Sequence, residues 1–250
     1  MRIRLAALAA SVAVSFVAPP VQADPITIVQ DQRFVMSDAF VFNDLGFAGA
    51  FAREQHQGSE ARDATAQASF GNTVSRAESR LDSSISTALA RFTGSGTATG
   101  VVDGRSGLAQ ASSRFELLFN VNEGRAFDFS AMFDALGGSW QAHLIESPGD
   151  FARQSLRFSF ISNIGGLTQE VSRHGFLNPG RYGFAIRSDA AGDTRFANRP
   201  TGRSAFNFAF NMSPVPEPAS LLLVGSGVAG LLGGAGRRAR RRSLESSSVS

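Results

Sequence analysis

Apolar and polar residues alternate along the second half of the chain. Every second residue of 115–121 and of 127–133 is apolar, and the turn-like sequence Asn122-Glu123-Gly124 lies between the two stretches. Because successive side chains of a strand point to opposite faces, each stretch predicts a strand with one buried face. The short loop between them predicts that the two strands pair as an antiparallel hairpin.

The same pattern continues toward the C-terminus. Alternate residues of 140–144, 156–160, 182–186 and 206–210 are apolar, and turn sequences such as Asn178-Pro179-Gly180 separate these segments. Residues 190–193 predict a further loop. Six alternating segments joined by short turns predict an all-β fold, an antiparallel β-sandwich with a jelly-roll-like arrangement.

The first half of the chain gives weaker predictions. Short strands are expected at 26–29, 34–36 and 40–42, and another at 64–70, where alternate residues are apolar. Within 74–92, Leu81, Ile85 and Leu89 recur every four residues, which fits one face of a helix or one face of a strand. The Ser, Thr and Gly content favours strands there, and the glycines of 93–107 predict a turn-rich ribbon or loop.

The N-terminal residues have the three parts of a secretory signal peptide. Two arginines within residues 1–4 precede an apolar stretch at 5–18, and Val21-Gln22-Ala23 supplies a small-x-small cleavage site. We therefore predict a signal peptide at 1–23, cut after Ala23, with signal peptidase and the general secretion machinery as partners. An N-terminal membrane anchor is disfavoured because the apolar stretch is short and ends at Pro19 and Pro20.

The C-terminal residues predict a membrane segment. After a linker at 212–218, residues 219–236 form an uncharged apolar run, which as a helix would span roughly 27 Å of a hydrocarbon core about 30 Å thick. This is barely enough for a transmembrane helix, and its glycines weaken it further. A basic tail follows at 237–250, and the positive-inside rule predicts a cytoplasmic position for its orienting arginines, Arg237, Arg238, Arg240, Arg241 and Arg242.

The residues just before this run are suited to recognition by a processing enzyme. Pro216 and Pro218 exclude a regular helix, and Pro218 favours an extended conformation for Glu217. The sequence therefore predicts an extended, exposed strip directly above a membrane anchor.

Pro216-Glu217-Pro218-Ala219-Ser220, the glycine-rich apolar run and the arginine cluster together resemble the bacterial PEP-CTERM sorting signal in order, spacing and orientation. The resemblance implies that exosortase, a membrane-embedded transpeptidase-like protease, recognises Pro216, Glu217 and Pro218 and removes the tail. One departure is the extra segment 243–250, because members of this family usually end soon after the arginines. The alternative is a plain tail anchor or stop-transfer helix with a proline-containing linker.

The resemblance also implies a location. Carriers of this signal are typically exported proteins of Gram-negative bacteria that make extracellular polysaccharide. We therefore expect a precursor anchored in the inner membrane, transiently or permanently, and then a protein of the cell envelope surface or the extracellular space.

The charge balance of the body, residues 24–211, differs from that of the whole chain. The chain has a net charge of +3, but seven of its 24 basic residues lie in the two terminal segments. The body keeps 17 arginines against 19 acidic residues, a net charge of −2, so we expect no nucleic-acid partner. The lack of cysteine excludes disulfides, a thiol nucleophile and cysteine metal sites, and the lack of lysine excludes a Walker loop.

Candidate catalytic residues in the body are few. His56, His143 and His174 are the only histidines, and none has the spacing of a metal or hydrolase motif. Asp128 and Asp134 would face each other only through a tertiary contact, and solvated strand positions are favoured for both. We therefore expect no enzymatic activity and no cofactor.

Two further pairs of residues suggest binding. Asp189 and Asp193 flank the predicted 190–193 loop and are weak candidates for a Ca²⁺ site, although aspartate is also an ordinary turn residue. Trp140 and Tyr182 have the ring and polar group that sugar-binding platforms use, but core packing is favoured for both.

Three functions follow, in order of preference. The first is a non-enzymatic protein of the cell surface or extracellular matrix, sorted by exosortase and associated with exopolysaccharide or biofilm. The second is a secreted carbohydrate-binding module, and the third is a secreted hydrolase.

Overall fold

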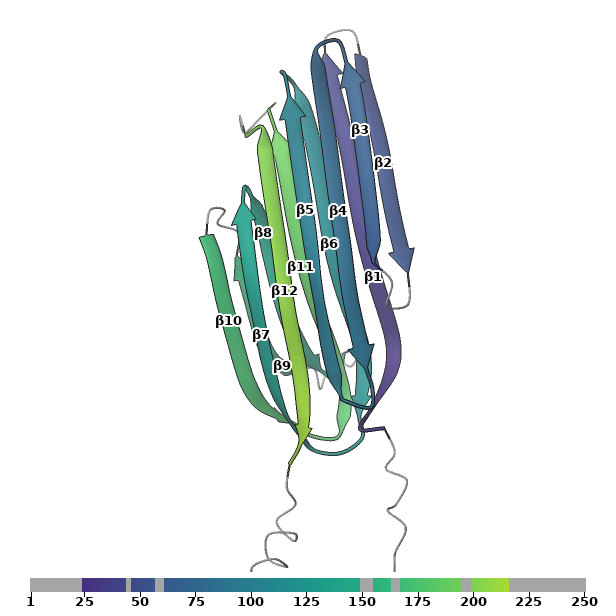
Figure 1. Ribbon diagram of the computed structural model, residues 1–250, viewed down its shortest axis with the longest axis vertical. Coiled ribbons are helices and arrows are strands. Elements are labelled where there is room, and N and C mark those ends of the chain that lie inside the picture. Colours follow the sequence, from purple (N-terminus) through teal and green to yellow (C-terminus); the bar gives the residue numbers. More distant parts are fainter. Residues whose placement is uncertain are drawn as a thin grey trace, which may run out of the picture.

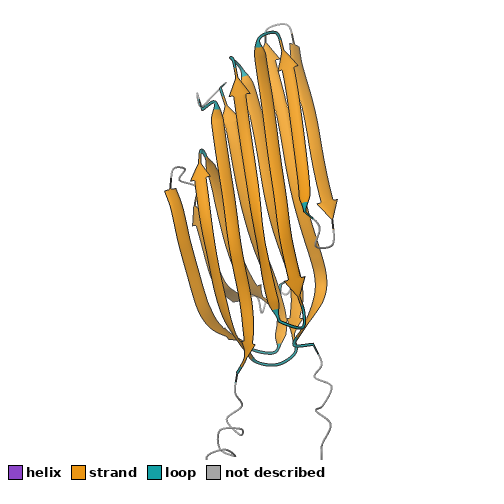
Figure 2. Cartoon of the chain, in the orientation of Figure 1, coloured by secondary structure: helices purple, strands orange, loops and turns teal. Residues whose placement is uncertain are grey.

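The computed structural model describes residues 24–43, 46–56, 61–148, 155–162, 167–194 and 199–215. Within these ranges the regular structure is entirely β, and Figure 2 shows strands and loops without helices. The strands, labelled in Figure 1, are β1 (Ile26–Asn43), β2 (Gly46–His56), β3 (Arg62–Phe70), β4 (Thr73–Ser86), β5 (Arg91–Asp103), β6 (Gly107–Val121), β7 (Arg125–Leu136), β8 (Gly138–Glu146), β9 (Ser155–Ser162), β10 (Leu167–Leu177), β11 (Gly180–Asp193) and β12 (Thr201–Pro214).

The strands form two antiparallel sheets packed face to face. Sheet A has the order β2-β1-β6-β11-β8-β9, and sheet B has the order β10-β7-β12-β5-β4-β3. The last eight strands pair in a nested way, β5 with β12, β6 with β11, β7 with β10 and β8 with β9. This nesting is the strand order of a jelly roll. Two further strands extend each sheet, β1 and β2 in sheet A and β4 and β3 in sheet B. The predicted all-β sandwich is confirmed.

The predicted hairpin across residues 122–124 is wrong. β6 and β7 belong to different sheets, so this turn carries the chain from sheet A to sheet B. The alternating residues were assigned to the correct face, since Phe115, Phe119, Phe127 and Phe133 are all buried. An alternating pattern identifies the buried face of each strand, but it does not distinguish pairing side by side from packing across a core.

Two stretches of the first half, predicted as short strands and as an ambiguous segment in which strand was favoured, are mostly strand. The three short strands expected at 26–42 form one strand, β1, whose register shifts between Ile28 and Gln30. The ambiguous stretch 74–92 is mostly strand β4, in which Leu81 is buried, whereas Leu89 lies in the following turn and is 70% exposed. The four-residue spacing therefore marks one face of β4 at Leu81 and Ile85, but it does not apply to Leu89.

The glycine-rich stretch 93–107 is not a loop, because most of it is strand β5 in the middle of sheet B. Its alternate residues 96, 98, 100 and 102 are buried, and two of these are glycines. A Cβ at Gly100 would lie 2.4 Å from the carbonyl oxygen of Ala109 on the facing sheet. Glycine is present here because the two backbones approach closely, not because the chain turns.

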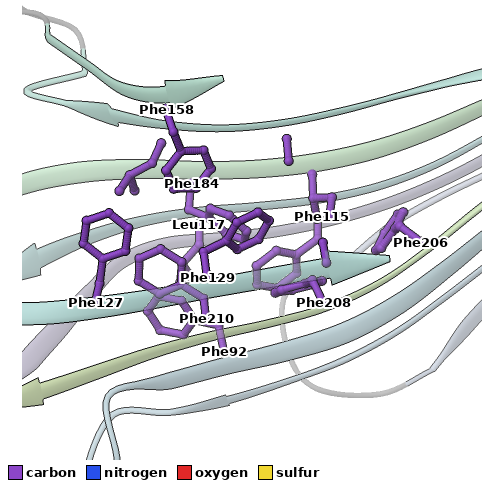
Figure 3. Packing of buried hydrophobic residues seen from close by; sticks show 14 of the residues in the cluster. Phe92, Phe115, Leu117, Phe127, Phe129, Phe158, Phe184, Phe206, Phe208 and Phe210 are labelled. Carbon is purple, nitrogen blue, oxygen red and sulfur yellow. The ribbon is translucent and has the colours of Figure 1, made fainter. Parts of the chain in front are cut away.

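Phenylalanine fills one part of the interior. Figure 3 shows phenylalanine rings from both sheets gathered in one cluster. Phe129 of sheet B stacks on Phe158 of sheet A with ring centroids 4.8 Å apart, and within sheet B Phe127 stacks on Phe210 at 5.5 Å. Burial of such rings is the largest apolar contribution to folding in this body. The buried phenylalanines are Phe92, Phe115, Phe119, Phe127, Phe129, Phe133, Phe158, Phe184, Phe206, Phe208 and Phe210.

Small residues fill the other part of the interior, called the thin layer below. Its buried side chains are mostly alanines and serines from β1, β3, β4, β5, β6 and β11, among them Ala77, Ala98 and Ala109, and they include Val41 and Val102. Facing sheets usually lie about 10 Å apart, but here a serine hydroxyl reaches the backbone of the opposite sheet. Ser75 Oγ donates to Leu108 O at 2.6 Å, and Ser113 Oγ donates to Arg80 O at 2.9 Å.

A buried arginine lies between the two parts of the core. Arg33 is 2% exposed and forms two hydrogen bonds of 3.1 Å with the carboxylate of Asp31. Its third contact is a 2.9 Å bond from Nη1 to Ser83 O on the facing sheet, and its guanidinium lies 5.6 Å from the ring centre of Phe115. The charge is therefore paired and hydrogen-bonded, as a buried cation requires.

The last strand extends beyond the predicted end of the body. β12 continues to Pro214, three residues past the expected boundary at 211, because residues 212–214 still pair with β7. The predicted linker at 212–218 is therefore partly strand. The predicted signal peptide at 1–23 and the apolar run at 219–236 lie outside the described residues.

Gly202→Ala should destabilise the protein by about 1–3 kcal/mol, the usual cost of overpacking. Its Cβ would lie 2.3 Å from Ala191 O and 2.8 Å from Ala191 N, which are backbone atoms of the facing strand. Urea unfolding of the mature protein would measure the change.

The matched control is Gly183→Ala on the outer face of β11. There the new Cβ meets side-chain atoms at ordinary contact distances, Pro148 Cγ at 3.4 Å, Pro148 Cβ at 3.5 Å and Leu118 Cδ1 at 4.0 Å, so the free energy of unfolding should change by less than about 0.5 kcal/mol. Equal unfolding midpoints for the two variants would contradict the close approach of the sheets.

Candidate functional site

The two ends of the body lie together at one end of the sandwich, called the terminal end below. Figure 1 shows the start of β1 and the arrowhead of β12 side by side at the lower end. Asn122 Nδ2 donates to Asp24 O at 2.8 Å and to Thr27 Oγ1 at 3.2 Å, while Arg125, a few residues on, lies opposite Pro214 in the β7–β12 register. The connection between β6 and β7 therefore holds both the beginning and the end of the body.

A hollow of about 210 Å³ lies on the outer face of sheet A and is called the His143 groove. Its floor is made of small residues of β11, so the side chains of the neighbouring strands stand as walls. The walls combine amide, carboxylate and imidazole groups with apolar side chains. The lining side chains include Gln30, Gln32, Glu116, Leu118, His143, Ile145, Pro148 and Ala185.

His143 is the titratable group most altered by this setting. Burial lowers its pKa, and this effect outweighs the opposing influence of Glu116; Arg114 lowers the pKa as well. Glu116 is itself ion-paired with Arg114. The imidazole is therefore neutral at pH 7, and the groove offers hydrogen-bonding groups beside apolar walls without an unpaired charge on either Arg114 or Glu116.

The other residues considered as catalytic candidates do not gather around His143. His174 lies on β10 of sheet B, opposite Asp128 on β7, whereas His143 lies on β8 of sheet A. Asp134 is six residues beyond Asp128 on the same strand and forms an ion pair with Arg203. The two aspartates therefore do not face each other. The side chain of His56 lies outside the described part of the chain.

The loop expected at 190–193 is strand, since β11 continues to Asp193. Asp189 and Asp193 are thus four residues apart on one strand, a separation of about 13 Å, which is too far for both to bind one ion directly. Asp189 is paired with Arg187, whose Nε lies 2.7 Å from the carboxylate. Within the described ranges, no group of three or more His, Asp or Glu residues is placed to hold a metal ion.

Trp140 and Tyr182 both belong to the core, as the favoured interpretation predicted. Trp140 stacks on Phe133 with ring centres 3.8 Å apart, and it is 3% exposed. The hydroxyl of Tyr182 donates to Asn178 O at 3.0 Å, and burial together with Glu146 raises its pKa. Neither ring is available to stack on a sugar.

Sequence reasoning missed a group of aromatic residues on the outer face of β1 and β2, called the β2 aromatic cluster: Phe40, Phe42, Phe47 and Phe51. Phe47 is 71% exposed and Phe51 is 65% exposed. Phe51 packs edge-on against Phe40 with ring centres 5.2 Å apart. The signal was present in the sequence Gly46-Phe47-Ala48-Gly49-Ala50-Phe51-Ala52, where phenylalanines and alanines occupy opposite faces.

Comparison with known families gives one match, which begins where β12 ends. Residues 214–242 fit the model of the PEP-CTERM protein-sorting motif. The chain carries a PEP-CTERM protein-sorting motif. This confirms the resemblance drawn from the sequence, implies exosortase as the processing partner and indicates an exported protein.

The parts of the PEP-CTERM motif that were predicted to act lie outside the described residues. These are Pro216, Glu217 and Pro218, and the arginines Arg237, Arg238, Arg240, Arg241 and Arg242. The predicted cleavage position Ala23 also lies outside them. In the part of the chain that the structure describes, no helix is long and apolar enough to cross a membrane.

Comparisons with curated proteins and solved structures give only distant likenesses. A search of curated proteins found no match. Among solved structures, the chain is similar to a CBM4 structure (12% identity, 47% of this chain and 75% of that chain, TM-score 0.24). It is also similar to TmCBM61 in complex with β-1,4-galactotriose (11% identity, 54% and 82%, TM-score 0.25) and to a structure of infectious bursal disease virus Gx strain (8%, 77% and 57%, TM-score 0.26). These likenesses are too distant to carry a functional argument.

The free energy of unfolding should fall as the pH drops below the ordinary histidine value of 6.5, because unfolded His143 binds a proton there more readily than folded His143. His143→Gln should remove this part of the pH dependence between about pH 7 and about pH 5.5. Urea unfolding at several pH values would measure it, with His174→Gln on exposed β10 as the control. The idea fails if His143→Gln and wild type lose stability equally over this range.

Proposed function

We propose that this protein is a non-enzymatic component of the cell surface or extracellular matrix, exported and then processed by exosortase. The observation that carries the proposal is the PEP-CTERM motif at 214–242, which continues directly from β12. The predicted signal peptide at 1–23 supplies the other half of an export route.

The position of the chain ends at the terminal end determines how the body of the precursor is oriented relative to the membrane. Since the motif follows Pro214, the precursor is held at the terminal end and the body extends away from the membrane. The opposite end contains the β1–β2 turn, where Asn43 pairs with Gly46. The β2 aromatic cluster lies toward this outer end and is presented to the surroundings.

The arrangement of titratable groups supports a non-enzymatic role. His143 and His174 lie on outer faces of opposite sheets, and Asp134 and Asp189 are each paired with an arginine. Asp128 lies opposite His174, but both are exposed strand positions on the outer face of sheet B. General acid–base and nucleophilic catalysis require such groups within hydrogen-bond reach of one another. The body is therefore proposed to act through its surface.

Glu217→Ala should leave the full-length precursor in the membrane fraction, because it removes the charged residue of the Pro-Glu-Pro sequence that exosortase is expected to recognise. Immunoblotting of membrane and released fractions would measure the precursor and the shortened product. The control is Glu245→Ala, the same change in the tail beyond the arginines, which should be processed like wild type. Normal processing of Glu217→Ala would refute recognition through this sequence.

A second function, binding of an extracellular polysaccharide by the same body, is favoured by the His143 groove. Its walls place Gln30, Gln32 and Glu116 beside Leu118 and Ile145. Hydroxyl groups of a sugar pair with amides and carboxylates, while its C–H faces pack on apolar side chains. Neutral His143 adds a hydrogen-bonding group without adding charge.

Ala185→Leu should abolish polysaccharide binding, because Ala185 lies on the groove floor and a larger side chain fills the hollow without entering the core. Affinity electrophoresis of the mature protein in gels containing the exopolysaccharide of the producing cells would detect binding. Ala209→Leu, the same change on the outer face of sheet B, is the control and should bind like wild type. Equal retardation of wild type and Ala185→Leu, or none for wild type, would exclude this role of the groove.

A further inference from the structure

Each sheet of the sandwich ends in strands that have one unpaired side within the described residues: β2 and β9 in sheet A, and β3 and β10 in sheet B. An open edge presents backbone N–H and C=O groups that can pair with another strand. Proteins commonly prevent such pairing with charged residues or proline on the edge. The four edges differ in this respect.

Two of the edges carry charge within the strand, since β9 contains Arg157 and β10 contains Glu170 and Arg173. β3 is charged only at its start, at Arg62 and Asp63, and its residues 64–70 are uncharged. In β2, residues 46–52 contain neither a charge nor a proline, and unlike 64–70 of β3 they expose two large apolar side chains, Phe47 and Phe51. The first seven residues of β2 are therefore an unprotected edge.

The aromatic residues of this edge are arranged symmetrically. Phe47 and Phe51 lie two residues before and two residues after Gly49, all on the outer face. If a second β2 pairs antiparallel with Gly49 opposite Gly49, each Phe47 lies opposite the other copy's Phe51 on the same face. At the centre, Gly49 has no side chain, and the ring of Phe40 lies 3.0 Å from the position a Cβ would take.

We infer that β2 is a self-association edge, through which two copies of this chain join their A sheets by antiparallel pairing centred on Gly49. The occupant is a second copy because the segment is complementary to itself and has no charge to repel its own image. Cross-strand aromatic pairs at these positions stabilise such a contact.

The area of the contact sets its strength. Phe47 and Phe51 are each about two-thirds exposed, so the four rings of two copies offer about 400–700 Å² of aromatic surface, and the strand edges add to it. Stable interfaces bury at least about 1,000 Å² in total. The dimer is therefore weak and reversible, and it forms where the local concentration is high.

The antiparallel pairing also determines how the two copies are oriented relative to each other. Antiparallel β2 strands place the two terminal ends at opposite extremes of the dimer. If the proposed export is correct, this contact joins copies released from the membrane or held on two facing surfaces, rather than neighbours on one membrane. The pairing itself does not depend on export and is tested on purified protein.

The test uses the absence of native cysteine. Residues opposite each other in an antiparallel pair have Cα atoms about 4.5–5.5 Å apart, which a disulfide spans. Gly49→Cys should therefore form a disulfide-linked dimer under mild oxidation, detected by non-reducing electrophoresis. Thr65→Cys, an exposed position on edge strand β3, which has no exposed large apolar side chain, is the control and should remain monomeric.

Sedimentation velocity over about 1–200 µM provides the second measurement and requires no change at Gly49. Wild type should show a concentration-dependent dimer, and Phe51→Ser should weaken its dissociation constant at least about tenfold, whereas Phe176→Ser on β10 should not. A wild-type protein that stays monomeric over this range, or equal cross-linking of the two cysteine variants, would overturn the inference.

Discussion

The close approach of the two sheets constrains the rest of this sandwich. Where β5 crosses β6 and β11, the buried residues are glycines, alanines and serines, with Val102 the one larger apolar side chain of that cluster. Serine hydroxyls such as those of Ser75 and Ser113 donate to carbonyl oxygens of the facing sheet, and an unpaired buried hydroxyl would cost about 1–3 kcal/mol. Because hydrogen bonds are directional, these contacts fix the position of one sheet over the other more narrowly than apolar packing alone.

The thin layer decides where large side chains are placed. Rings such as Phe129 and Phe210 are gathered in the thicker part of the core, and Arg33 lies at the boundary with its charge paired to Asp31. On β1 and β2, whose inner residues are alanines and a serine over much of their length, phenylalanines such as Phe51 face outward instead. The chain ends lie at the terminal end, away from these exposed phenylalanines.

Much of the fold could be predicted from alternation of side chains, because burial of one face is a local property. The burial of Phe206 and Phe208 and the strand at Trp140 follow from it. Which strands pair depends on contacts distant in sequence, so the turn at 122–124 was assigned to a hairpin although it joins two sheets. In the sequence, glycines such as Gly100 resemble loop residues, because the closeness of the facing backbone is not visible there. The exposure of the phenylalanines of β2 could not be predicted either, because it depends on which face of β2 packs against the other sheet.

The sorting motif could be recognised fully from sequence because it acts as a linear signal, whereas the body's surface needed the structure. The sandwich is proposed to be exported and then cut by exosortase just after its last strand, β12. Mass spectrometry of the mature C-terminus, from native cells with and without exosortase, tests this most directly. We expect a mature protein that contains β12 through Pro214 but lacks residues 219–250 when exosortase is present, and an intact tail when it is absent. An identical C-terminus in both strains would contradict the account.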